Sequence, residues 1–335
     1  MTAAHQQIRL LRVNDLPWSA DWSTVFGTEP DRPLILEIGF GYGQMLRHLS
    51  KTRPDANILG VEISNVCLVK AEGAIARGEL PNVRVMFAMA ETALHHLFAP
   101  QSIHEIHINF PDPWFKNRHE HRRLMQRETV DVMVSRLLPG ARLYLATDIL
   151  EYAEMSAELL ADTPGLSNIL DAPWVNSLPG RAATKYETRA RQEGRICYYF
   201  VYERNSQSAP AIPVMEDAPM PHIVFSSPLS LQDIESHFAP TEYTERRTHV
   251  NYINLYLSNK VGLFEVFIDE PTIEQRVALI LVKRDSATDE YTLQMGSIGS
   301  PRPTQGMHVA VRHLADWIVQ LHPESKIVQS KLRQD

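Results

Sequence analysis

The sequence contains a glycine-rich turn of a kind that binds ligands. Gly39, Gly41 and Gly43 follow the apolar segment Leu34–Ile38 and stand at the start of a helical pattern. A glycine turn between a strand and a helix lets the backbone approach a ligand closely, and the helix N-terminus adds the positive end of a dipole. Dinucleotide-binding folds use the spacing G-x-G-x-x-G, but the third position of that pattern is Gln44 here. The turn therefore favours a ligand without a pyrophosphate, and a purely structural turn is the alternative.

Two carboxylates accompany this turn. The spacing E-x-G-x-G-x-G, which begins at Glu37, resembles motif I of S-adenosylmethionine (AdoMet) methyltransferases. An acidic residue before the turn can face the cationic end of such a ligand, directly or through water. Glu62 closes a second apolar segment, Asn57–Ile63, and a carboxylate at a strand end can accept hydrogen bonds from both ribose hydroxyls. NAD-binding proteins use the same contact, so Glu62 does not distinguish between the two cofactors.

A restrained carboxylate and a group of cations follow the strand pattern Ile103–Phe110. Asp112 lies between two prolines, which restrict its backbone and place its carboxylate at the carboxyl edge of the sheet, where a reacting base would meet the methyl group of a cofactor. Such a cationic patch beside an aromatic residue, Trp114, suits an RNA backbone and a splayed base. A solvated helix start is the alternative. The cations are Lys116, Arg118, Arg122, Arg123 and Arg127.

Two later segments carry further polar groups. Asp148 follows the strand pattern Arg142–Thr147 and is either a substrate contact or a helix cap. The segment Thr184–Glu187 lies in an irregular stretch that has five cations between Arg181 and Arg195. Its hydroxyl, ammonium, phenol and carboxylate groups offer donors and acceptors to a nucleotide, and an ordinary polar loop is the alternative.

No metal site is predicted. The chain has two cysteines, Cys67 and Cys197, which are too few for a disulfide framework or a four-cysteine zinc site. It has no HExxH motif. Four histidines could suggest a metal, but surface histidines are the better interpretation. They are His104, His107, His119 and His121.

The residues that could do chemistry lie at the ends of alternating strand and helix patterns within residues 1–204. Such alternation indicates βαβ units in a doubly wound, mostly parallel α/β sheet, with sites at the carboxyl ends of the strands. Strand patterns cover Leu34–Ile38, Asn57–Ile63, Val83–Phe87, Ile103–Phe110, Arg142–Thr147 and Cys197–Glu203. Helical patterns cover Gly43–Thr52, Asn65–Arg77, Glu91–Phe98, His121–Leu138 and Ile149–Ala161.

A proline-rich stretch, residues 205–221, divides the chain and is expected to be an extended linker. Residues 222–335 have a different pattern, in which strands precede a helix. This order indicates a smaller α+β domain with an antiparallel sheet and a C-terminal helix. The strand patterns are Thr248–Leu257, Leu263–Ile268, Val277–Val282 and Tyr291–Ile298, and the helical pattern is Met307–Leu321.

Composition limits the classes of function. The chain of 335 residues suggests about two domains. Its net charge of −7 excludes a protein that is basic throughout, but not a basic patch. Residues 205–335 carry 11 basic and 16 acidic side chains, a net charge of −5, which makes this part a poor phosphate binder. No apolar window approaches the roughly 18–20 residues of a membrane span. We therefore expect a soluble, cytoplasmic protein without a membrane partner.

Together, the motifs resemble the bacterial tRNA (guanine-N7)-methyltransferase family. The resemblance runs from about Trp22 to about Arg204 and does not extend past the proline-rich stretch. Each segment is modest alone, but in this order and at these element ends they are highly specific. The segments are Leu36–Gly43, Gly60–Ile63, Pro111–Arg123, Ala146–Glu154 and Thr184–Arg189.

The resemblance implies a seven-stranded methyltransferase sheet, S-adenosyl-L-methionine as methyl donor, and a guanine in the variable loop of tRNA as acceptor. Asp112 matches the catalytic aspartate, which also lies near the cofactor. The implied cofactor contacts are Glu37, Gly39, Gly41, Glu62, Met89 and Asp112. The implied substrate contacts are Lys116, Arg118, Asp148, Thr184, Lys185, Tyr186 and Glu187. Met89 stands where the family usually has Asp or Asn, so that contact is lost, moves to Glu91, or is made by the backbone.

Two other functions remain open from the sequence. An AdoMet enzyme that acts on a small molecule explains the glycine turn but leaves the basic segments without a role. A non-catalytic RNA-binding protein on a methyltransferase fold is the second alternative. Residues 222–335 resemble no family that we identify, and we expect an accessory domain that contacts a protein partner or a second copy of the chain.

Overall fold

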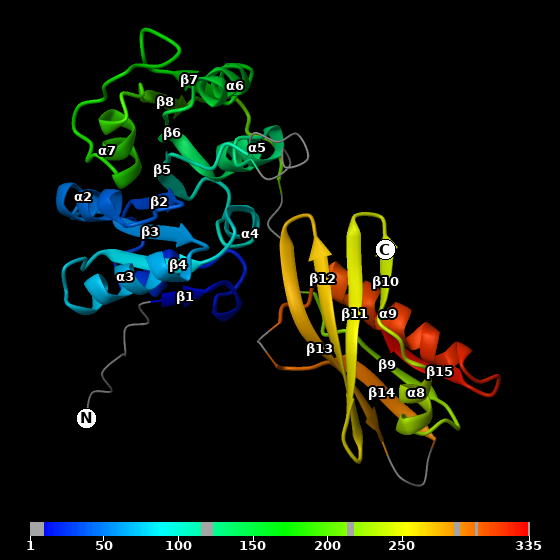
Figure 1. Ribbon diagram of the computed structural model, residues 1–335. Coiled ribbons are helices and arrows are strands. Elements are labelled where there is room, and N and C mark those ends of the chain that lie inside the picture. The colour runs from blue at the N-terminus through cyan, green and yellow to red at the C-terminus, as the bar shows by residue number, and fades with distance from the viewer. Residues whose placement is uncertain (1–9, 115–122, 213–217, 285–288, 299–300, 334–335) are drawn as a thin grey trace. The chain divides into compact units, whose positions relative to one another are not determined.

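The computed structural model describes residues 10–114, 123–212, 218–284, 289–298 and 301–333. The chain forms two compact units, residues 1–215 and 216–335 (Figure 1). Each unit has its own sheet and its own apolar core. Among the described helices, none is both long enough and apolar enough to cross a membrane.

Unit 1 is built on a sheet of eight described strands in the order β1-β4-β3-β2-β5-β6-β8-β7. The neighbours from β1 to β6 are parallel, whereas β8 is antiparallel to β6 and to β7. This confirms the predicted doubly wound sheet, with a short strand, β1, added at one edge. The strands are β1 (Leu10–Arg12), β2 (Leu34–Ile38), β3 (Asn57–Glu62), β4 (Val83–Phe87), β5 (Ile103–Asn109), β6 (Leu137–Thr147), β7 (Leu166–Asn168) and β8 (Tyr198–Arg204).

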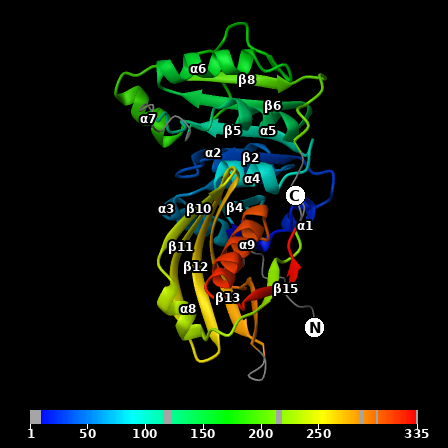
Figure 2. The ribbon, with the colours of Figure 1, turned by 90° about the vertical axis from the view of Figure 1, so that its right-hand side faces the viewer.

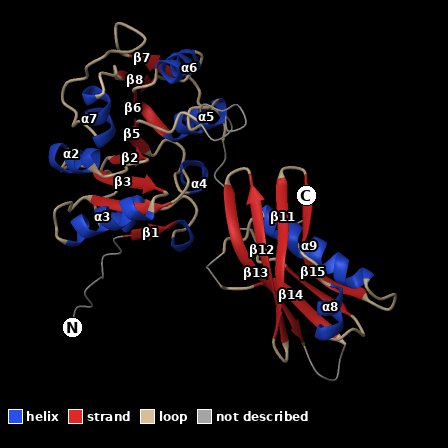
Figure 3. Cartoon of the chain, in the orientation of Figure 1, coloured by secondary structure: helices blue, strands red, loops and turns tan. Residues whose placement is uncertain are grey.

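Helices cover both faces of this sheet (Figure 3). Because strand side chains alternate between faces, Leu36 of β2 joins the apolar cluster of α4, α5 and α6, whereas Ile35 joins the cluster of α2 and α3. Glu37 therefore faces the same side as Ile35. The described α-helices are α1 (Trp22–Phe26), α2 (Gln44–Thr52), α3 (Asn65–Ala76), α4 (Ala90–His96), α5 (Arg127–Arg136), α6 (Leu150–Ala161) and α7 (Lys185–Gln192).

Two helix predictions differ from the structure. The pattern from His121 to Leu138 predicts one long helix, but α5 begins at Arg127 and ends at Arg136. Leu138 belongs instead to β6, because a residue that precedes a proline avoids the helical region. The stretch after Arg181 is predicted to be irregular, yet it contains α7. The Thr184 hydroxyl caps this helix by accepting a hydrogen bond from the Glu187 N–H at 3.1 Å.

Unit 2 is an antiparallel sheet of seven described strands in the order β10-β11-β12-β13-β14-β9-β15. Figure 2 shows α9 (Gln305–Gln320) running along this sheet, where its buried side chains complete the core. The sequence patterns predict neither α8 (Leu231–His237) nor the strands β9, β10 and β15. All seven described strands of the sheet are β9 (His222–Ser226), β10 (Thr241–Glu245), β11 (Thr248–Leu257), β12 (Val261–Glu270), β13 (Ile273–Lys283), β14 (Glu290–Met295) and β15 (Lys326–Lys331).

Part of the predicted linker packs against unit 1. The Arg136 side chain is buried and donates a hydrogen bond to the Ile212 carbonyl at 3.0 Å. Ala209 and Ile212 also contact the apolar core of unit 1. The limits 1–204, 205–221 and 222–335 remain a prediction, and residues 205–212 are not a free spacer in the structure.

Candidate active site at the carboxyl ends of the strands

The glycine turn follows β2 and has the backbone that its sequence predicts. Gly39, Gly41 and Gly43 have φ angles of 68°, 53° and 73°, in the left-handed region that side chains other than glycine rarely enter. The Gly39 N–H donates to the Val61 carbonyl at 2.8 Å, and the Gly43 N–H donates to the Phe40 carbonyl at 2.9 Å. The turn is thereby held between the ends of two strands.

Glu62 fastens this turn to the end of β3. Its Oε2 accepts a hydrogen bond from the Gly41 N–H at 2.9 Å. Its Oε1 accepts from the N–H groups of Ile63 and Ser64, each at 2.9 Å. A carboxylate has about four acceptor positions, so Glu62 can still accept about one hydrogen bond, from a hydroxyl group of a ligand. The sequence did not anticipate these three backbone contacts.

A cleft of about 260 Å³ lies at the carboxyl ends of β2, β3 and β5. Parallel strands place these ends on one edge of the sheet, so residues far apart in the sequence converge there. The cleft brings together six of the predicted site residues. They are Gly39, Gly41, Glu62, Met89, Asp112 and Tyr186.

Asp112 is exposed at the wall of this cleft. The residues two positions before and two positions after it have unusual backbones: φ is 53° at Phe110 and 43° at Trp114. Non-glycine residues in the left-handed region carry strain and cluster at functional sites. The Arg123 side chain donates to the Pro113 carbonyl at 3.1 Å and the Trp114 carbonyl at 3.4 Å, which fixes the segment that presents Asp112.

Glu37 lies beneath the cleft rather than in its wall. The side chain is 1% exposed. Its Oε1 accepts a hydrogen bond from the Asn109 amide at 3.1 Å, while its Oε2 has no partner in the described structure. Burial raises the pKa of Glu37 to about 8, against the opposing effects of Asn109 and Arg181. Asn109 lines the cleft, so it stands between this carboxyl group and a bound ligand.

Met89 is the residue before α4, and its side chain is about half exposed. Both Met89 and Glu91 line the cleft. Replacement of the acidic or amide side chain that the family resemblance implies at position 89, by Glu91 or by the backbone, stays a prediction.

The segment Thr184–Glu187 splits into residues that face the cleft and residues that do not. Tyr186 lines the cleft, and the Lys185 ammonium lies 4.0 Å from the centre of the Tyr42 ring. Thr184 is used as the cap of α7. Glu187 is buried and accepts hydrogen bonds from Arg191 at 3.2 and 3.1 Å. Only Tyr186 of this segment is thus in the wall of the cleft.

Several predicted nucleic-acid contacts have other positions. Asp148 forms an ion pair with Arg195 and is not the N-cap residue of α6, which is Ile149. Arg127 donates to the Thr163 hydroxyl at 2.8 Å, so this cation of the predicted patch is engaged within the protein, as Arg123 is. Lys116, Arg118 and Arg122 lie outside the described residues.

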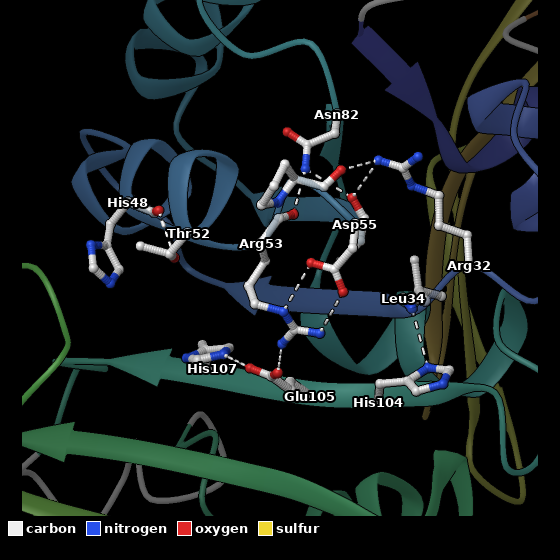
Figure 4. A network of polar contacts seen from close by, with 12 residues as sticks. Arg32, Leu34, His48, Thr52, Arg53, Asp55, Asn82, His104, Glu105 and His107 are labelled. Carbon is white, nitrogen blue, oxygen red and sulfur yellow. Dashed lines mark hydrogen bonds and ion pairs between the residues drawn. The ribbon is translucent and has the colours of Figure 1, made fainter.

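Two of the four histidines considered as metal ligands, His104 and His107, are described, and they have separate partners (Figure 4). His104 accepts a hydrogen bond from the Leu34 N–H at 3.2 Å. His107 contacts Glu105 at 2.9 Å, and Glu105 also pairs with Arg53. Burial lowers the pKa of His107. In the part of the chain that the structure describes, no three potential metal ligands gather; His119 and His121 lie outside it.

Comparison with known proteins shows the family of this chain. A family model described as a putative methyltransferase matches residues 31–200. The chain is 38% identical over 188 residues to a tRNA (guanine-N(7)-)-methyltransferase of Paraburkholderia xenovorans (strain LB400), covering 56% of this chain and 71% of that protein. It is 35% identical over 196 residues to the enzyme of the same name from Vibrio cholerae serotype O1 (strain M66-2), covering 57% and 80%.

Among solved structures, the 16S rRNA methyltransferase KamB matches 52% of this chain and 88% of its own, with 17% identity and a TM-score of 0.40. Both of these tRNA (guanine-N(7)-)-methyltransferases are matched over more than two thirds of their length. As its motifs predict, the chain belongs to the tRNA (guanine-N7)-methyltransferase family.

Proposed function

We propose that this protein transfers the methyl group of AdoMet to N7 of a guanine in tRNA and so forms 7-methylguanosine. The observation that carries the proposal is the single cleft that joins the glycine turn, Glu62 and Asp112 at one edge of the sheet, in a chain of this family. The variable loop is the target that the family resemblance implies. A tRNA substrate also implies a cytoplasmic protein.

The residues around the cleft fit AdoMet, which supplies a methyl carbon activated by a neighbouring sulfonium charge. The left-handed glycines allow close approach of the backbone. Glu62 retains about one acceptor position, on Oε2, for a ribose hydroxyl. The Glu37 carboxyl group, with one unpartnered oxygen, can ionise when the cationic end of the ligand lies nearby and then oppose that charge, through Asn109 or through water. Ile38, Val61 and Ile63 supply the apolar part of the wall.

Guanine N7 has an in-plane lone pair and no proton, so no general base has to remove one. The protein must instead hold the ring in line for the transfer. Asp112 can accept hydrogen bonds from the N1–H and N2–H groups of guanine. This pairing selects guanine over adenine and stabilises the positive charge that methylation leaves on the ring. Lys116 and Arg118 are proposed to position phosphates rather than to read bases.

The decisive experiment is methyl transfer from labelled AdoMet to an unmodified tRNA transcript, followed by nucleoside analysis of the product. We expect 7-methylguanosine as the labelled nucleoside. The matched control is the same tRNA with 7-deazaguanosine only at the variable-loop guanine, where a carbon replaces N7, and we expect no label there. Label in the control would move the target elsewhere, and AdoMet binding without any tRNA methylation would favour the small-molecule alternative.

The absence of AdoMet binding in calorimetry would instead favour a non-catalytic RNA-binding protein.

Residues 222–335 stay a proposed accessory domain that contacts a protein partner or a second copy of the chain. Size-exclusion chromatography with light scattering tests the second possibility directly.

A further inference from the structure

A buried row of polar side chains connects the cofactor turn with α7. Asn109 at the end of β5 donates to Glu37 at 3.1 Å. Arg181, in the loop before α7, donates to the Asn109 oxygen at 2.6 Å. The Arg181 guanidinium also lies 3.9 Å from Glu187 in the first turn of α7. Asn109 and Arg181 are 72 residues apart in the chain, so only the fold brings them together.

The orientation of the Asn109 amide follows from its two neighbours. Its NH2 group faces a carboxyl oxygen of Glu37, and its oxygen faces a guanidinium. The flipped amide would place its NH2 group against the guanidinium, which loses the hydrogen bond from Arg181, and its oxygen against the carboxyl group, which loses the second bond when Glu37 is ionised. Arg181 therefore fixes which atoms Asn109 presents to Glu37 and to the cleft that Asn109 lines.

Arg181 lies between two buried acids. Its side chain is 9% exposed and that of Glu187 is 6% exposed. One oxygen of Glu37, one oxygen of Glu187 and the Nε of Arg181 have no hydrogen-bond partner in the described structure. A buried cation is tolerated only where opposite charge or hydrogen bonds compensate it. The stacking of Arg181 over the Tyr199 ring, 4.9 Å from its centre, gives it a further fixed contact.

The same guanidinium contacts α7, and residues of α7 lie over the glycine turn. Tyr186 of α7 lies over the glycine turn, since a Cβ atom on Gly41 would be 3.7 Å from its ring. Lys185 lies over Tyr42 of the turn. A shift of α7 would therefore change the wall of the cleft, and Arg181 joins α7 to the end of β5.

We propose that Arg181 is a positioning residue which, through Asn109, couples the cofactor carboxyl Glu37 to the substrate segment Thr184–Glu187. This inference rests on the proposed function, because it assigns the two ends of the row to AdoMet and to tRNA. It assigns no contact between Arg181 and either reactant.

The test compares Arg181→Met with Arg191→Met in the full-length protein. Both arginines contact Glu187, but in the described structure only Arg181 reaches Asn109. We expect Arg181→Met to weaken AdoMet binding about tenfold in calorimetry without tRNA, the scale of one lost charge-assisted hydrogen bond. Arg191→Met should leave that affinity within about twofold. Equal effects of the two variants would overturn the proposal.

Two further variants exclude a merely structural role. Arg181→Lys keeps the charge and should recover part of the AdoMet affinity, and it also serves if Arg181→Met does not fold. In a double-mutant cycle, Glu37→Gln combined with Arg181→Met should weaken AdoMet binding by less than the product of the single effects. A simple product would show that the two residues act independently and would overturn the coupling.

The AdoMet measurements also separate this inference from the proposed function. If the cycle shows coupling but tRNA receives no methyl group, the substrate assignment fails and the connection from Arg181 to Glu37 stands. If tRNA is methylated and the cycle is additive, the function stands and the role of Arg181 fails.

Discussion

Glu37 in unit 1 and the partly buried Glu270 in unit 2 have different surroundings. Burial raises the pKa of Glu37 in unit 1 and of Glu270 in unit 2. Glu270 accepts a hydrogen bond from the Gly306 N–H at 2.8 Å and another from the Thr304 hydroxyl. Both of its oxygens therefore have partners. Glu37 has one amide partner and one oxygen without any.

The contacts of Glu270 explain its burial by structure alone. Thr304 and Gly306 stand at the start of α9, where unpaired N–H groups and the helix dipole favour a negative charge. A Cβ atom at Gly306 would lie 2.6 Å from the Glu270 carboxyl carbon, so a side chain there would displace this carboxylate. A buried acid is thus no sign of an active site in itself. The distinguishing feature of Glu37 is that unit 1 leaves it incompletely paired beside a cleft.

The largest effect should come from the acid that lines this cleft. Asp112→Ala should reduce kcat by about 10²–10³-fold, the scale of removing one group that stabilises developing charge. Binding of tRNA should persist, since phosphate contacts supply most of the affinity. Steady-state kinetics and filter binding check both. Asp269→Ala in unit 2 is the control, and a turnover near wild type in Asp112→Ala would refute the catalytic assignment.

The second prediction compares the substitution of Glu37 with the substitution of Glu270. Glu37→Gln should weaken AdoMet binding by about 1–3 kcal/mol, because an amide cannot ionise opposite a cationic ligand. Glu270→Gln should leave AdoMet affinity unchanged and lower the free energy of unfolding by about 1 kcal/mol through weaker capping of α9. Calorimetry and urea denaturation measure the two quantities. If Glu270→Gln also weakens AdoMet binding, the distinction between a structural and a functional acid is wrong.

The third prediction concerns pH. Because the folded protein raises the pKa of Glu37 from 4.5 to about 8, the folded state binds its proton more tightly than the unfolded chain does. The resulting stabilisation is complete below the unfolded pKa and is lost as the pH rises through about 8. Between pH 7 and 9, the wild type should lose about 1 kcal/mol of unfolding free energy relative to Glu37→Gln.

Urea denaturation of both proteins at each pH measures this difference, and the subtraction removes the other titrating groups. Arg181 opposes the shift and Glu62 supports it, so neither is substituted in this comparison. If the difference between the two proteins stays constant over this range, Glu37 is already ionised at pH 7 and its pKa is not raised to about 8.

The main elements of unit 1 were predictable because their apolar runs are long. β2 and β4 match their predicted bounds, as β11 does in unit 2. Two of the missed strands lack such a signal: β7 has three residues, and β15 is exposed throughout. Helix α7 is almost wholly polar, so its helical conformation depends on the Thr184 cap and on ion pairs rather than on apolar periodicity.

The convergence of the glycine turn, Glu62 and Asp112 was also predictable, since each follows a parallel strand. The partners of these residues were not. Glu62 accepts hydrogen bonds from three backbone N–H groups. Arg123, which is predicted to be part of the RNA-binding patch, donates instead to the backbone beside Asp112. Alternation along β5 puts Asn109 on the same face of the sheet as His107, and His107 lies opposite Glu37 in the strand register. This was the one sequence signal for the contact between Asn109 and Glu37. Arg181 gave none, because the loop that carries it has no periodicity.

The smallest effect should come from removing unit 2. A chain that ends at Ile212 keeps every described residue of the cleft and the hydrogen bond from Arg136 to the Ile212 carbonyl. We expect its kcat/KM for tRNA methylation to stay within about twofold of the full chain, which is a change of less than about 0.5 kcal/mol in the activation free energy.

A chain that ends at Ser208 should be less stable, because Arg136 is fully buried and would lose the Ile212 acceptor at a cost of about 1–3 kcal/mol. Thermal melts of the two truncated chains measure that difference. An insoluble protein or a non-cooperative melt at both lengths would show that the two units share a core. If truncation at Ile212 flattens the dependence of tRNA affinity on salt, unit 2 contacts phosphates despite its net negative charge.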